Sequence, residues 1–119
     1  MPKTKKIPEK KILDAVLHAL EEKKAEDIRI FAVGKLVDYT DHFVFCSGTS
    51  STHISGIADE VYNELRKNKV LVKESGDKKS GWIVLDCDDV IVHCFGKAER
   101  AFYDLEGLWE DADIIHHHY

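Results

Sequence analysis

The chain has 119 residues, 44% of them hydrophobic and 33% charged, so it is long enough for one domain with a hydrophobic core and too apolar to remain disordered. Its 17 basic and 22 acidic side chains give a net charge of −5, which argues against the wrapping of bare nucleic acid as its main task and favours a basic protein partner. Its apolar runs are only a few residues long, so we predict no membrane span, no signal peptide, and reduced thiols at Cys46, Cys87 and Cys94 in a cytoplasmic protein.

The first half of the chain predicts a helix, two strands and a second helix. Between residues 9 and 22 apolar side chains recur at helical spacing, at Ile12, Val16, Ala19 and Leu20. β-Branched and aromatic residues predict strands over 28–33 and 42–47. The turn at 48–51 supplies an N-cap hydroxyl to a helix that runs to about residue 68, with its apolar face at Ile54, Ile57, Ala58, Val61 and Leu65.

A strand over 70–74 and a polar loop lead into a predicted hairpin. A two-residue turn at 88–89 pairs Cys87 with Val90, Leu85 with Val92, and Ile83 with Cys94, so one face is wholly apolar. The other face carries Trp82, Val84, Ile91 and Phe95, with Asp86 and His93 on a diagonal. Because both faces are largely apolar, we expect the hairpin to be covered on both sides or to offer one face to a partner.

A last helix is predicted over residues 97–109. Its apolar face comprises Ala98, Ala101, Phe102, Leu105, Leu108 and Trp109. Tyr103 falls almost opposite this face, beside Glu99, Glu106 and Glu110, which suits contact with a basic surface; a surface tyrosine without a partner is the alternative. The tail after Asp113 is expected to be weakly ordered, and its histidine run, native or the remnant of a tag, is given no functional weight.

This order of elements contains a β-α-β unit and predicts an α/β fold. We expect one domain over residues 1–119, with its core at about 9–112 and a mixed five-stranded sheet on which the helices pack.

Several residue groups resemble chemical sites but favour structural roles. Residues 48–51 open a helix that could hold a phosphate, yet they lack the lysine of a P-loop, and nucleotidyl transfer needs paired carboxylates that the following strand does not provide. Asp86 and His93 are predicted to form a structural pair. The cysteines lack metal-ligand spacing, and Cys87 and Cys94 are predicted to pack as apolar groups. We therefore expect no catalytic residue, no metal and no cofactor.

Longer motifs resemble one family. They are KAEDI at 24–28, DYTDHFV at 38–44, GTSSTHI at 48–54, GWIVLD at 81–86, DVIVH at 89–93 and RAFYDLEGLW at 100–109. In this order they resemble the Iojap family, also called ribosomal silencing factors (RsfS), over residues 10–112. The resemblance implies a nucleotidyltransferase-like fold without the catalytic carboxylates.

The resemblance also implies a partner. Members bind the large ribosomal subunit through its ribosomal protein number fourteen, block docking of the small subunit and repress translation. The family's binding positions correspond to Trp82, Cys87 and Tyr103, where Cys87 replaces a larger residue, and Asp88 stands where many members have glycine. We expect Glu99, Glu106 and Glu110 to surround the contact, a monomer or homodimer, and no sequence-specific nucleic-acid binding. The alternatives are a nucleotidyl- or phosphoryl-transferring enzyme of the same fold and an assembly factor of the large subunit.

Overall fold

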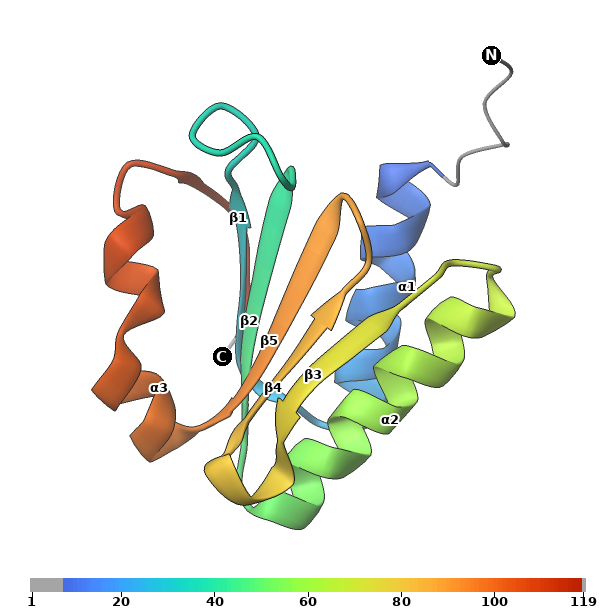
Figure 1. Cartoon of the computed structure of the whole chain (residues 1–119), viewed down its shortest axis with the longest axis vertical. Coiled ribbons are helices and arrows are strands. Elements are labelled where there is room, and N and C mark those ends of the chain that lie inside the picture. Colours follow the sequence, from blue (N-terminus) through green and yellow to red (C-terminus); the bar gives the residue numbers. More distant parts are fainter. Residues whose placement is uncertain (1–7, 119) are drawn as a thin grey trace.

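The computed structural model describes residues 8–118, apart from the side chain of Lys78, and the lysine-rich segment before Pro8 lies outside this range. The helices are α1 (Glu9–Glu22), α2 (Ser51–Lys67) and α3 (Lys97–Tyr103). The strands are β1 (Glu26–Ala32), β2 (His42–Gly48), β3 (Lys73–Asp77), β4 (Trp82–Asp86), β5 (Val90–Gly96) and β6 (Asp113–His118), and the 3₁₀ turns are η1 (Lys78–Ser80) and η2 (Leu105–Trp109). In Figure 1, α1 and α2 cover one face of the sheet, whereas α3 and η2 lie on the other side.

The strands form one mixed sheet in the order β3-β4-β5-β2-β1-β6. Among the described strands, β2 and β5 are the parallel pair and all other neighbours are antiparallel. This confirms the predicted α/β class. It also places the starts of α2 and α3 side by side, because each helix follows the C-terminal end of one of the two parallel strands.

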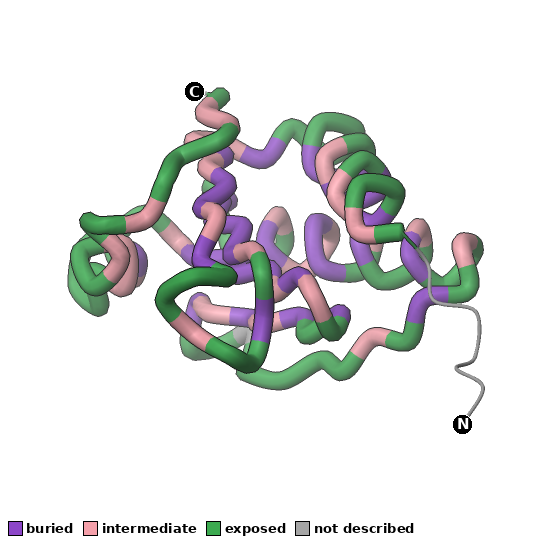
Figure 2. The backbone as a smooth tube through the Cα atoms, turned by 90° about the horizontal axis from the view of Figure 1, so that it is seen from above, coloured by how far each residue is buried: buried purple, intermediate pink, exposed green. Residues whose placement is uncertain are grey.

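The larger part of the core lies between the sheet and the two N-terminal helices. Helix α1 has the predicted bounds, and its buried residues include all four that define the predicted face. Helix α2 buries the five predicted residues, and Ser50 caps it by accepting a hydrogen bond from the His53 N–H at 3.0 Å. Figure 2 shows the buried parts of both helices turned toward the sheet. These predictions are confirmed because apolar spacing decides which side of a helix is buried.

The β4–β5 hairpin also has its predicted register. Leu85 pairs with Val92 and Ile83 with Cys94, and the Cys87 N–H donates to the Val90 carbonyl at 2.8 Å. The face predicted to be apolar is fully buried against α1 and α2. The thiols of Cys87 and Cys94 pack there as predicted.

The sheet has six strands, so the prediction of five is wrong. The sixth is β6, which pairs with β1 in the segment that was expected to be weakly ordered. At the opposite edge, β3 begins at Lys73, three residues later than the predicted strand, and all five of its residues are exposed. Backbone hydrogen bonds hold both edge strands. Because these bonds do not depend on side-chain type, the order of apolar and polar residues does not predict where such strands begin and end.

The predicted last helix breaks after Tyr103. Asp104 adopts a left-handed conformation at φ 44°, and the 3₁₀ turn η2 follows. The residue that α3 buries is Arg100, whereas Phe102 is 82% exposed and Leu108 is 71% exposed. The prediction that Ala98, Ala101, Phe102 and Leu108 face the core is therefore wrong, because a buried cation takes the inward position and Asp104 interrupts the helical spacing.

Candidate functional site

Three aromatic side chains form a connected surface beside α3. The ring centroids of Phe102 and Tyr103 lie 5.2 Å apart, and those of Tyr103 and Trp82 lie 4.9 Å apart. Trp82 is half-buried and stacks on the buried Phe95 at 5.2 Å, while Tyr103 is 45% exposed. We call Trp82, Phe102 and Tyr103 the aromatic surface. Its outer rings are accessible to a partner and its inner ring rests on the core.

The buried side chain of His93 positions Trp82 by a hydrogen bond. The Trp82 Nε1–H donates to His93 Nδ1 at 3.3 Å, and the imidazole stacks on Phe45 at 5.0 Å. The predicted pairing of His93 with Asp86 is wrong: Asp86 is exposed, and its carboxylate accepts from the Asp88 N–H at 3.1 Å. Strand register does put Asp86 and His93 on one face, but the indole is the polar partner that reaches the buried imidazole.

Burial lowers the pKa of His93 from 6.5 to about 4. Between these two pH values the unfolded chain binds a proton that the folded chain does not, so acid favours unfolding. We expect the free energy of unfolding to fall by about 3 kcal/mol from this group as the pH drops from 6.5 to 4. Urea unfolding at several pH values would measure this loss. His93→Asn, which lacks a titrating group, should show a correspondingly shallower acid dependence; equal slopes would contradict the assignment.

Arg100 fixes α3 to the sheet. Its guanidinium donates to both oxygens of Glu106, at 2.7 and 2.9 Å, to Ser47 Oγ at 2.9 Å and to the Asp27 carbonyl at 2.8 Å. The side chain is only 8% exposed. Because Glu106 belongs to η2, this single cation joins β1, β2, α3 and η2 and thereby sets the position of the aromatic surface.

Further ion pairs extend this network to the C-terminal strand. Asp27 Oδ1 lies 2.8 Å from His117 Nε2 on β6, and Arg29 lies 3.3 Å from Asp27 and 3.5 Å from Glu106. Burial alone would raise the pKa of the Asp27 carboxyl, but His117, Arg100 and Arg29 outweigh it and hold this pKa below its usual value. The histidine run therefore takes part in the fold through His117.

The three glutamates predicted to surround Tyr103 do not form a ring. Glu106 is bound to Arg100, and its side chain is only 16% exposed. Glu99 lies against Gly81 and Gly96, where its carboxylate fills the space that a side chain at either position would need. Glu110 is exposed but follows η2, beyond the break at Asp104. The ring was predicted from one continuous helix, and that helix ends at Tyr103.

Cys87 offers no surface to a partner. Its side chain is fully buried, and burial together with the nearby Asp86 charge raises the pKa of the thiol to about 12. The Cys87 side chain packs in the core cluster between the sheet and the two N-terminal helices. We therefore do not retain Cys87 as a contact residue.

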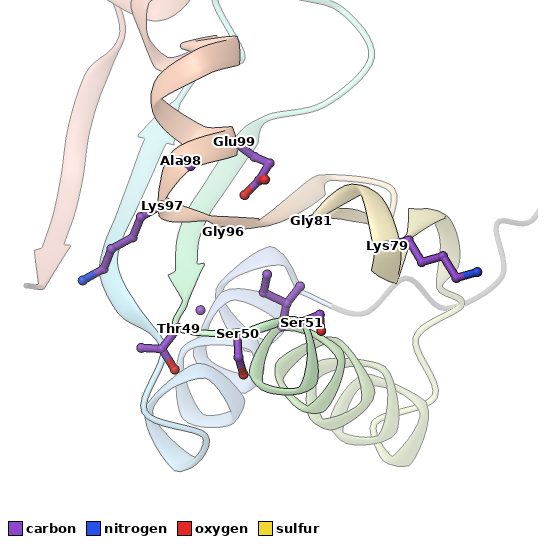
Figure 3. Close-up of a pocket in the computed structure, with 11 residues that line it drawn as sticks. Thr49, Ser50, Ser51, Lys79, Gly81, Gly96, Lys97, Ala98 and Glu99 are labelled. Atoms are coloured by element: carbon purple, nitrogen blue, oxygen red, sulfur yellow. The ribbon is translucent and has the colours of Figure 1, made fainter.

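A pocket of about 440 Å³ lies where α2 and α3 begin, at the place where residues 48–51 suggested a phosphate site. Figure 3 shows Lys79 and Lys97 extending away from it, and Lys97 Nζ pairs with Glu26 at 2.8 Å. Of the described residues that line the pocket, only Glu99 carries a carboxylate. Asp86 lies at the far end of β4, so the pocket lacks the paired carboxylates that metal-dependent nucleotidyl transfer requires.

Within residues 8–118, no helix is long and apolar enough to cross a bilayer, and no three metal-binding side chains gather as a ligand set. Sequence reasoning missed the part that Phe102 and Arg100 play in the site. The apolar character of Phe102 predicts a core residue, whereas its ring is exposed. Arg100 was passed over, although an arginine six residues before Glu106 in the motif RAFYDLE is a signal that could have indicated the pair.

Comparison with known proteins gives one consistent result. The family described as "Ribosomal silencing factor during starvation", RsfS, matches residues 4–118. The ribosomal silencing factor RsfS of Bacillus subtilis is 36% identical over 107 residues, which cover 89% of this chain and 91% of that protein. A mouse protein named "Mitochondrial assembly of ribosomal large subunit protein 1" is 30% identical over 101 residues, which cover 82% of this chain and 44% of the mouse protein.

Solved structures show the same fold. A crystal structure of a Chromobacterium violaceum protein superposes with a TM-score of 0.83 at 28% identity, and the match covers 87% of each chain. A Bacillus halodurans crystal structure gives a TM-score of 0.76 at 31% identity, covering 84% of this chain and 94% of the other.

Proposed function

Because this chain belongs to the ribosomal silencing factor family, we propose that it binds the large ribosomal subunit through ribosomal protein number fourteen and sterically blocks docking of the small subunit. Translation is then repressed by occupancy, and the protein acts in the cytoplasm without catalysing a reaction. The nucleotidyltransferase-like fold would serve as a rigid frame for the contact.

The observation that carries this proposal is the aromatic surface. Aromatic side chains that are exposed on one side and supported on the other are typical anchors of protein interfaces. By the motif resemblance, Trp82 and Tyr103 correspond to the family's binding positions, and Phe102 adds an 82% exposed ring next to them. When a partner covers an exposed ring of this size, removal of its apolar surface from water favours binding.

The charge of the C-terminal part of the chain, which includes and follows the end of α3, suits a basic partner. Beyond Arg100 the sequence holds five carboxylates and no lysine or arginine; these are Asp104, Glu106, Glu110, Asp111 and Asp113. All except Glu106 are exposed. Such charges steer a basic protein toward the surface more than they hold it there, so Glu99 and Glu110 are proposed as rim residues.

A role in assembly of the large subunit is the second candidate, since the name of the mouse relative describes such a role. An assembly factor would associate with precursor particles in preference to mature large subunits. The enzyme alternative has less support, because the pocket beside Glu99 lacks paired carboxylates. It would require metal-dependent nucleotide binding.

The proposal is tested by adding the protein in excess to separated ribosomal subunits and resolving the products on a density gradient. We expect a smaller peak of joined ribosomes and co-sedimentation of the protein with the large subunit alone. An undiminished joined peak at saturating protein, or co-sedimentation with the small subunit, would contradict it. Preferential binding to precursor particles would favour the assembly role.

A further inference from the structure

The connection between α2 and β3 is strongly basic in an otherwise acidic protein. Residues 66–73 carry Arg66, Lys67, Lys69 and Lys73 and no carboxylate, while the remaining chain has 13 basic and 22 acidic side chains. All four cations are exposed, and none forms an ion pair within the part of the chain that the structure describes. We call residues 66–73 the basic segment.

Backbone hydrogen bonds define the turn at the start of this segment. Helix α2 ends in a turn in which the Val70 N–H donates to the Leu65 carbonyl at 2.9 Å and the Lys69 N–H donates to the Arg66 carbonyl at 3.0 Å. Lys69 has φ 62°, a left-handed conformation that glycine usually occupies at this position. Val70 is buried and fastens the turn to the core. A lysine is therefore fixed at a tight turn where an uncharged glycine would fit more easily.

The basic segment leads into β3, the edge strand that pairs with the strand carrying Trp82. Lys73 lies opposite Asp86 in the β3–β4 register, four residues along β4 from Trp82, which corresponds to about 13 Å. Asp86 partly offsets the charge of Lys73, so Arg66, Lys67 and Lys69 are the free cations. A protein interface of ordinary size, about 800 Å² per partner, is roughly 30 Å across. A surface of this size centred on Trp82 therefore ends near Lys73. The three cations at the end of α2, which covers the opposite face of the sheet, lie beyond its margin, where the surroundings of the bound protein begin.

We propose that the basic segment contacts the phosphate backbone of ribosomal RNA next to the bound ribosomal protein. This inference rests on the proposed function. Lysine ammonium groups suit phosphates because they are compact charges that need no fixed geometry, and contact with the backbone requires no sequence reading. Leu71 is exposed, but one isolated leucine offers little apolar area to a protein or a bilayer. Contact with RNA phosphates is compatible with the prediction that this protein does not read nucleic-acid sequence.

The test measures affinity for intact large subunits between 50 and 200 mM salt. The variant is Arg66→Gln/Lys67→Gln/Lys69→Gln. The matched control is Lys23→Gln/Lys24→Gln/Lys35→Gln, which removes equal charge and includes Lys24, a second left-handed lysine after a helix, at φ 56°. Three lost phosphate contacts should reduce the salt slope by about 2–3, so that over this range the variant loses roughly 20–40-fold less affinity than the unaltered protein. The control should keep the full slope.

Binding to the isolated ribosomal protein number fourteen separates this inference from the proposed function. The basic-segment variant should bind the isolated protein as tightly as the unaltered chain does. An equal loss of affinity for the isolated protein would mean that the segment contacts protein and would overturn the inference, as would an equal change of slope in the control. If the unaltered chain does not bind the isolated protein at all, the proposed function itself fails.

Discussion

Arg100→Met is expected to lower the free energy of unfolding by about 3–5 kcal/mol. Methionine fills similar space but leaves the largely buried Glu106 carboxylate with Arg29, 3.5 Å away, as its remaining cation, and it removes the hydrogen bonds to Ser47 and to the Asp27 carbonyl. Removing one partner of a buried pair costs more than the pair contributes, because the remaining charge stays desolvated. Urea unfolding followed by circular dichroism would measure the loss.

Two variants control this experiment. Lys97→Met removes a cation from the same helix, but Lys97 is exposed and its partner Glu26 can return to water, so the unfolding midpoint should not change. Arg100→Met/Glu106→Leu removes both buried charges and should be more stable than Arg100→Met alone. If the single Arg100 and Lys97 variants unfold at the same urea concentration, the network is not what holds α3.

The parts of this fold that sequence reasoning predicted correctly are those in which side-chain burial decides the structure. Helices α1 and α2 show an apolar face at helical spacing, and the β4–β5 hairpin has a continuous apolar face and a short polar turn. In each case a shift of one residue would expose apolar side chains to water. The spacing of apolar residues therefore predicts these elements and their register.

The parts that were wrong are held by polar or backbone contacts. Strand β3 was predicted but with its bounds displaced, and β6 was not predicted. Both edge strands form through backbone hydrogen bonds, and residues such as Ser75 or His118 do not indicate a strand. In α3, the buried Arg100 depends on Glu106, Ser47 and Asp27, which come from three other elements. Apolar periodicity does not predict that an arginine faces the sheet, and it therefore predicts that Phe102 lies in the core.

Of the candidate site, the sequence predicted Trp82 and Tyr103 but not the exposure of Phe102 or the burial of Cys87. Trp82 and Tyr103 came from motif resemblance, and the exposure of Tyr103 is confirmed, although it results from an inward Arg100 and not from an apolar face opposite. Cys87 carried over from the family, but a small thiol at this position is buried. Position in a motif indicates where a contact lies in relatives, whereas the burial of Cys87 depends on the face of the hairpin that it occupies in this chain.

Tyr103→Ala is expected to weaken binding to the large subunit by about thirtyfold or more while changing the free energy of unfolding by about 1 kcal/mol or less. Tyr103 is 45% exposed and contacts Trp82 from the outside, so the core does not depend on it. Phe102→Ala should likewise leave the fold intact and weaken binding, since its ring is more exposed still. Co-sedimentation with large subunits gives the affinity, and thermal unfolding gives the stability.

Tyr62→Ala is the matched control for this prediction. Tyr62 is a second partly exposed tyrosine, 36% accessible, on α2 at the opposite face of the sheet, and its loss should change neither binding nor stability appreciably. Equal affinities of the Tyr103 and Tyr62 variants would place the contact elsewhere on the protein. A Tyr103 variant that unfolds as readily as Arg100→Met would instead show that the aromatic surface is part of the structural core. Loss of binding in a stable Tyr103 variant, with normal binding in the Tyr62 variant, is the result that supports an interface built on Trp82, Phe102 and Tyr103.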